Sequence, residues 1–175
     1  GETAFSHANK LQTIELDENN YTFSVVDGCL IKNANATLLK ATNNAIIPDF
    51  VKSIEQAAFA ALEDIAEVSI PSGVIEVPTY FAVGCYNLDK VTLPAALEVI
   101  NTQAFYKCTK LCTSVGGVLV IPDSVTTIRS NAFAQCDALT DVTLPKNLVT
   151  MGSGSNFQDC RSLKTIRFRN STMAA

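Results

Sequence analysis

The sequence predicts a solenoid, a fold in which short similar units stack along one axis. Five of the six prolines, each following an apolar residue, recur at intervals of 23, 23, 28 and 23 residues. A cysteine returns at the same place in successive units, and the residues before each proline alternate between apolar and polar, as in a strand with one buried face. Because one such unit cannot bury its apolar face alone, we expect stacking to form a continuous core.

The prolines divide the chain into units. Five complete repeats are predicted over residues 47–168, and they are marked by Pro48, Pro71, Pro94, Pro122 and Pro145. Residues 1–16 are interpreted as part of one more repeat, residues 17–46 as an inserted β-hairpin module and residues 169–175 as a C-terminal tail. The whole chain, residues 1–175, is expected to form a single repeat domain, which is an ordinary domain size.

Each unit is predicted to contain a proline-marked bend, a short extended piece, a compact turn and a short strand. The extended pieces are expected to end at Ile54, Val77, Ile100, Ile128 and Met151. In most units the turn has a phenylalanine three residues before the recurrent cysteine position: Phe59, Phe105, Phe133 and Phe157. In the second unit Ala82 falls in this position and Phe81 lies beside it, so the register is expected to be irregular there.

The recurrent cysteines are Cys85, Cys108, Cys136 and Cys160, and Leu62 and Ala8 occupy the same position in the remaining units. A position that accepts Cys, Leu and Ala is typical of buried, packed side chains. A reactive cysteine would need a neighbouring base or cation. We therefore predict free, buried thiols. The replacement Cys136→Ser is expected to cost about 1 to 3 kcal/mol if the hydroxyl finds no partner.

The module at residues 17–46 has its own turn signals. Asp27-Gly28 lies between two apolar runs and predicts a type I′ hairpin turn, and the stretch "NANA" at residues 33–36 predicts a second turn. We expect a small β-meander from about Phe23 to Lys40.

The strand before each proline should present alternate side chains to solvent. Since Val142 and Leu144 point inward, Asp141 and Thr143 should point outward. The outward positions define a candidate binding surface, called the strand face below: Glu67, Ser69, Lys90, Thr92, Val118, Val120, Asp141, Thr143, Thr165 and Arg167. Its central valines, surrounded by polar residues, favour a protein ligand. A glycan ligand is an alternative, less favoured because Trp is absent and no tyrosine falls on the strand face.

Composition disfavours several other functions. A net charge of −4 without a basic run argues against nucleic-acid binding, and carboxylates interrupt every apolar segment before it reaches the length of a transmembrane span. No catalytic, metal or cofactor motif is recognised, so no enzymatic activity and no cofactor are expected. The pair Cys108 and Cys112, at the start of the longer 28-residue interval, leaves a thiol- or metal-dependent activity as a third hypothesis.

The pattern "LxxVTLPxxLxxIxxxAFxxCxxL" resembles the BspA-like class of leucine-rich repeats, best known from bacterial surface proteins, over the whole chain. This resemblance implies a right-handed solenoid of short parallel strands, turns and short helical pieces, with the strands forming one parallel sheet along one face. It also implies a cell-surface or secreted location and binding of a protein such as one of the host extracellular matrix. A structural spacer that carries other domains is the alternative, and uncapped ends would allow self-association.

Overall fold

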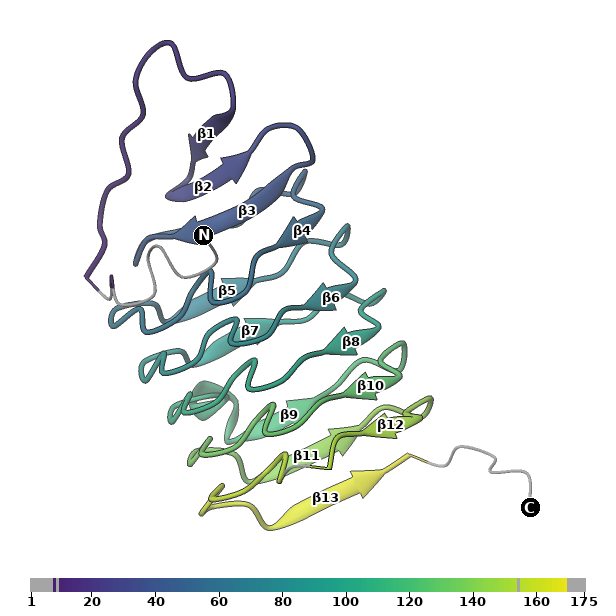
Figure 1. Ribbon diagram of the computed structural model, residues 1–175. Coiled ribbons are helices and arrows are strands. Elements are labelled where there is room, and N and C mark those ends of the chain that lie inside the picture. The colour runs from purple at the N-terminus through teal and green to yellow at the C-terminus, as the bar shows by residue number, and fades with distance from the viewer. Residues whose placement is uncertain (1–7, 9, 154, 170–175) are drawn as a thin grey trace.

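The computed structural model describes residues 8, 10–153 and 155–169 and shows a solenoid, as predicted. Successive units stack along one axis, with a strand on each of two sides (Figure 1). The strands of the first side are β5 (Glu67–Ser69), β7 (Lys90–Thr92), β9 (Val118–Val120), β11 (Asp141–Leu144) and β13 (Thr165–Phe168). Those of the second side are β4 (Ser53–Ile54), β6 (Glu76–Val77), β8 (Val99–Ile100), β10 (Thr127–Ile128) and β12 (Thr150–Met151).

Helix is nearly absent from the described residues. The one helical piece in this part of the chain is a single 3₁₀ turn, η1 (Thr113–Val115), and turns make up the other connections. No helix of the described residues is long and apolar enough to span a membrane.

Strand pairing within the solenoid is parallel, but it is interrupted on both sides. On the first side, β5 pairs with β7, and β9, β11 and β13 form a separate sheet. The strands along this face are parallel, as expected, but they form two sheets rather than one. On the second side, β6, β8, β10 and β12 form one sheet, whereas β4 pairs with a strand of the N-terminal module.

The N-terminal module has the predicted hairpin. It contains β1 (Phe23–Val26), β2 (Cys29–Lys32) and β3 (Thr37–Ala41), which pair antiparallel in that order. Asp27 and Gly28 have φ values of 47° and 75°, the left-handed conformation that a type I′ turn requires at both central positions. Strand β3 then pairs parallel with β4, so the module covers the N-terminal side of the first complete repeat.

The phenylalanines form a continuous stack through the core. Centroids of successive rings lie 5.0 to 5.7 Å apart along the series Phe59, Phe81, Phe105, Phe133 and Phe157. The second unit does not break the register. By its backbone hydrogen bonds Ala82 is the counterpart of Phe105, because the Ala82 amide bonds to Ala104 as the Phe105 amide bonds to Ala132. The unit has exchanged the order of Ala and Phe, and the ring of Phe81 still enters the stack.

A second ladder lies beside the rings. The cysteine thiols donate to the carbonyl at the phenylalanine position one unit earlier: Cys85 to Phe59 at 3.0 Å, Cys108 to Ala82 at 3.2 Å, Cys136 to Phe105 at 3.2 Å and Cys160 to Phe133 at 3.1 Å. All six cysteines of the chain are buried and free, as predicted. The cysteine position therefore satisfies a buried backbone acceptor as well as filling volume.

Candidate functional site

The strand face has the predicted alternation of inward and outward side chains. The inward residues Val68, Leu119 and Val142 are buried. Of the outward residues, Asp141, Thr143 and Thr165 are half-buried, and the others are exposed: Glu67, Ser69, Lys90, Thr92, Val118, Val120 and Arg167. Val118 and Val120 are 41% and 52% exposed, which places an apolar pair at the middle of a polar surface.

Most charges on the strand face neutralise one another. Lys90 forms an ion pair with Glu67 on the adjacent strand, and Arg167 lies 3.0 Å from the carboxylate of Asp141. The Thr140 hydroxyl donates to Asp141 at 3.0 Å, and together with Thr165 and Arg167 it holds the pKa of this carboxyl below its ordinary value. The Lys90–Glu67 pair is solvent-exposed, and in the other pair Arg167 is exposed while Asp141 is half-buried, so both pairs contribute little to stability. Their main effect is to leave a nearly neutral polar rim around the valines.

A longer turn interrupts the sheet between β7 and β9. The Cys112 amide bonds to the Asp89 carbonyl at 2.6 Å, and the Ser114 amide bonds to the Asp89 side chain at 2.9 Å. The chain then bulges outward through η1 and closes on itself where the Gly117 amide bonds to the Cys112 carbonyl. The Asp89 carbonyl, directly before β7, thus accepts from the turn rather than from the start of β9, and the sheet divides here.

The thiols are not activated for chemistry. Burial raises the pKa of Cys85 to about 12 and that of Cys112 to about 11, and it raises the pKa of Cys108 well above its ordinary value. Lys40, only 2% exposed, is the nearest candidate base to Cys85, but its own pKa is lowered by burial. Burial thus shifts each of the two groups toward its neutral form. At both Cys108 and Cys112 burial favours the protonated thiol over the thiolate, which is the nucleophilic form.

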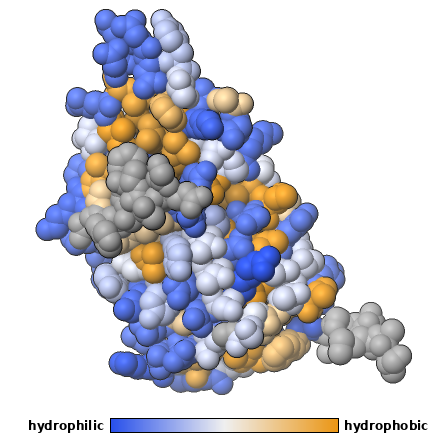
Figure 2. All heavy atoms as spheres, viewed as in Figure 1, coloured by the Kyte–Doolittle hydropathy of each residue, from blue (hydrophilic) through white to orange (hydrophobic). Residues whose placement is uncertain are grey.

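Within the described residues, no group of three or more His, Cys, Asp and Glu side chains is arranged to hold a metal ion. Three tyrosines, Tyr21, Tyr80 and Tyr86, are exposed, but none of them lies on the strands of the strand face. Figure 2 shows apolar residues gathered over the N-terminal module and again along the right-hand flank, where Figure 1 places β6 and β8.

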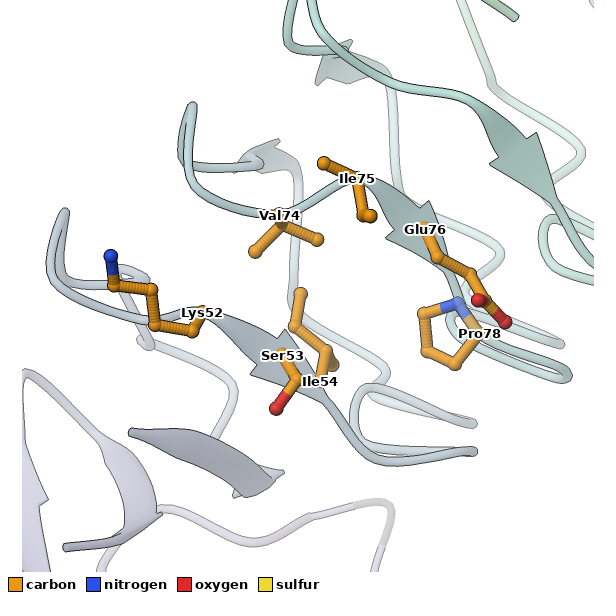
Figure 3. A pocket seen from close by; sticks show the side chains of 7 residues that line it. All are labelled: Lys52, Ser53, Ile54, Val74, Ile75, Glu76 and Pro78. Carbon is orange, nitrogen blue, oxygen red and sulfur yellow. The ribbon is translucent and has the colours of Figure 1, made fainter. Parts of the chain in front are cut away.

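This second apolar area includes a groove that the sequence analysis did not predict. It lies between β4 and β6, has a volume of about 280 Å³ and is lined by Lys52, Ser53, Ile54, Val74, Ile75, Glu76 and Pro78. Figure 3 shows the aliphatic side chains between the two strands, with Lys52 at one end and Glu76 beside Pro78 at the other. The sequence did contain a signal for an irregularity at this place, because Pro78 is the one proline that does not mark the start of a repeat.

The fold and the repeat pattern together define a leucine-rich-repeat solenoid. The family model described as "BspA type Leucine rich repeat region" matches six copies over residues 38–115 and 117–174. The chain therefore belongs to the BspA-type leucine-rich repeat family, as its sequence pattern predicted. Among curated protein sequences, none matches this chain significantly.

Solved structures of bacterial proteins share the fold. The pneumococcal vaccine antigen PcpA is 22% identical with a TM-score of 0.73, and the match covers 90% of this chain and 39% of PcpA. A leucine-rich cell surface protein from Faecalibacterium prausnitzii is 23% identical with a TM-score of 0.77, over 88% of this chain and 41% of its own. A leucine-rich repeat protein of T. pallidum is 25% identical with a TM-score of 0.63, over 87% and 71%. The chain thus spans about two-fifths of the first two proteins.

Proposed function

We propose that this protein is a non-enzymatic scaffold that binds a protein partner through the strand face, at the cell surface or in the secreted space. The observation that carries the proposal is the exposed pair Val118 and Val120, set in a surface whose charges are already paired. An interface core of apolar side chains with a polar rim is typical of protein recognition. The similarity to a leucine-rich cell surface protein of Faecalibacterium prausnitzii supports a surface location.

The turn at residues 112–117 supports the proposal that the strand face is the binding surface. It directly precedes β9, and its Val115 is 56% exposed, so the turn offers a further apolar side chain close to β9 along the chain. Solenoids bind through residues contributed by successive units, and expanded turns on one side often add contacts. A protein of the host extracellular matrix is the partner class that we would test first.

The test is binding of the purified protein to a panel of extracellular-matrix proteins and glycans. The double variant Val118→Asp/Val120→Asp should lose the interaction, because two carboxylates would have to be desolvated in the interface. The matched control is Val149→Asp/Met151→Asp, which adds the same charge at two exposed positions on and beside β12. It should bind as the wild type does.

Three outcomes would contradict the proposal. Glycan binding without protein binding would favour the glycan alternative, and no binding at all would favour a structural spacer. Equal loss in both double variants would remove the strand face as the site. Light scattering of each sample also measures self-association, for which Ile166 and Phe168 on β13 offer exposed apolar side chains.

A further inference from the structure

The groove between β4 and β6 exists because one backbone hydrogen bond cannot form. Along the second side, the residue after each short strand donates its amide to the strand of the unit before: Glu55 to Leu38, Asn101 to Val77, Arg129 to Ile100 and Gly152 to Ile128, at 2.7 to 3.0 Å. The equivalent residue of the second unit is Pro78, which has no amide hydrogen. The Ile54 carbonyl therefore has no donor from the next unit.

A second backbone hydrogen bond that would join β4 to β6 is also missing. In the following units the Ile75 carbonyl accepts from the amides of Glu98 and Val99, and the Glu98 carbonyl accepts from the next unit in the same way. By this register the Lys52 carbonyl should accept from Ile75 or Glu76. Among the described residues no backbone hydrogen bond joins β4 to β6, and the two strands belong to different sheets. Backbone acceptors and donors thus line an apolar groove.

The composition of the groove defines what it can hold. Its floor contains the buried residues Ile54, Val74 and Pro78. A volume of about 280 Å³ is below the range of about 300 to 1,000 Å³ that is usual for small-molecule pockets, so it suits one aliphatic side chain and its peptide group better than a whole metabolite. Unpaired main-chain groups beside a side-chain pocket are the two components of recognition by β-strand addition.

Charge distinguishes the two ends of the groove. The Asn101 side chain donates to Glu76 at 2.5 Å and to the Val77 carbonyl at 3.0 Å, so the carboxylate at one end is already engaged. Lys52 at the other end is exposed, and among the described residues its ammonium has no ion-pair partner. The charge left for a ligand is positive, at the Lys52 end (Figure 3).

We propose that this groove binds an extended peptide segment of a partner protein. The segment places one aliphatic side chain on Ile54 and Val74, pairs its backbone with the Lys52 and Ile54 carbonyls, and carries an acidic residue next to Lys52. This site is independent of the strand face, because it lies on the other side of the solenoid. Either site can fail without affecting the other.

Hydrogen exchange measured by NMR tests the unpaired edge without any ligand. The amides of Ile75 and Glu76 should exchange at least about tenfold faster than those of Glu98 and Val99, which occupy equivalent positions in the next unit. Equal protection in the two units would mean that the edge is paired, and this result would overturn the proposal.

Peptide binding tests the site itself. The probe is an array of acetylated and amidated heptapeptides with a central Leu, Ile or Val and an Asp or Glu on one side, compared with peptides that have a central Gly. The acidic aliphatic peptides should bind, and they should slow exchange of the Ile75 and Glu76 amides. No binding by any of them, or equal binding by the glycine peptides, would contradict the proposed chemistry.

Two variants test the location. Pro78→Asn restores the amide found at the equivalent Asn101 and should close the groove, and Ile75→Asp places a charge on its rim. Each should weaken peptide binding at least about tenfold. The control is Val149→Asp, which changes the position equivalent to Ile75 in the last unit, 83% exposed, and should leave binding unchanged. Binding that survives both groove variants, or that is lost equally in the control, would exclude this groove.

Discussion

At the scale of single residues, the cysteine ladder has a physical reason beyond volume. The Phe105 carbonyl accepts the Cys108 amide at 3.2 Å within its own turn, and the thiol of Cys136 reaches the same oxygen from the next unit at 3.2 Å. A thiol at this place therefore connects adjacent units through the core. An apolar side chain of similar size fills the space but makes no such bond.

This contact revises the expected effect of changing Cys136. The serine hydroxyl now has a partner in the Phe105 carbonyl, so Cys136→Ser should cost less than about 1 kcal/mol. Cys136→Ala removes both the donor and the sulfur volume and should cost about 1 to 2 kcal/mol. Urea unfolding of the two variants measures the difference. A serine variant that is no more stable than the alanine variant would show that the thiol hydrogen bond contributes nothing.

At the scale of elements, the turn at residues 112–117 determines how the strand face is divided. Gly116 and Gly117 both have positive φ values, of 68° and 79°, but their surroundings differ. A Cβ atom on Gly116 would meet nothing within 4 Å, whereas one on Gly117 would lie 2.3 Å from the Ala138 carbonyl oxygen. Gly117 is therefore required both by its conformation and by the close approach of the next unit.

The two glycines make a matched pair for mutation. Gly116→Ala should cost about 1 to 2 kcal/mol, because only the left-handed backbone is strained. Gly117→Ala adds a backbone clash and should cost about 2 to 5 kcal/mol, with displacement of β9 from β11. Denaturant unfolding measures the stabilities, and amide shifts of Val118 and Thr140 report the displacement. Equal losses in the two variants would argue against the close contact.

At the scale of the whole molecule, backbone hydrogen bonds join each unit to its direct neighbours, and the ion pair between Arg169 and Asp123 spans two units, so stability should vary along the axis. Val142 on β11 is fully buried between units, whereas Ile166 at the equivalent place on β13 is 40% exposed. The N-terminal side is covered by β1 to β3. Repeat proteins behave approximately as a sum of unit and interface terms, so a unit with one neighbour opens more easily than a unit with two.

Hydrogen exchange at two equivalent amides measures this variation of stability along the axis. The Lys164 amide bonds to the Thr140 carbonyl and the Thr140 amide bonds to the Gly117 carbonyl, both at 2.8 Å. Their hydrogen bonds have the same length, so a difference in exchange reports the position along the axis. Lys164 should exchange at least about tenfold faster, which corresponds to roughly 1.4 kcal/mol in opening free energy. Equal protection would mean that the solenoid opens as one cooperative unit.

Much of the fold was predictable because it depends on local periodicity. The proline intervals, the alternation in each strand and the Asp27-Gly28 turn predicted the units, the inward and outward positions and the hairpin. The outward orientation of the strand-face residues followed from the same alternation, with seven of the ten exposed and Asp141, Thr143 and Thr165 half-buried. These features depend on the spacing of side chains along one strand or one turn, and this spacing can be read directly from the sequence.

Only the tertiary structure decided what happens between units. It showed that the order of Phe81 and Ala82 leaves the ring stack intact, that the Cys136 thiol reaches a carbonyl of the previous unit, and that the longer turn divides the first sheet. It also showed that Pro78, which lacks an amide hydrogen, causes the open groove between β4 and β6. Each of these features depends on which backbone group of one unit faces which group of the next, and that pairing exists only once the units are stacked.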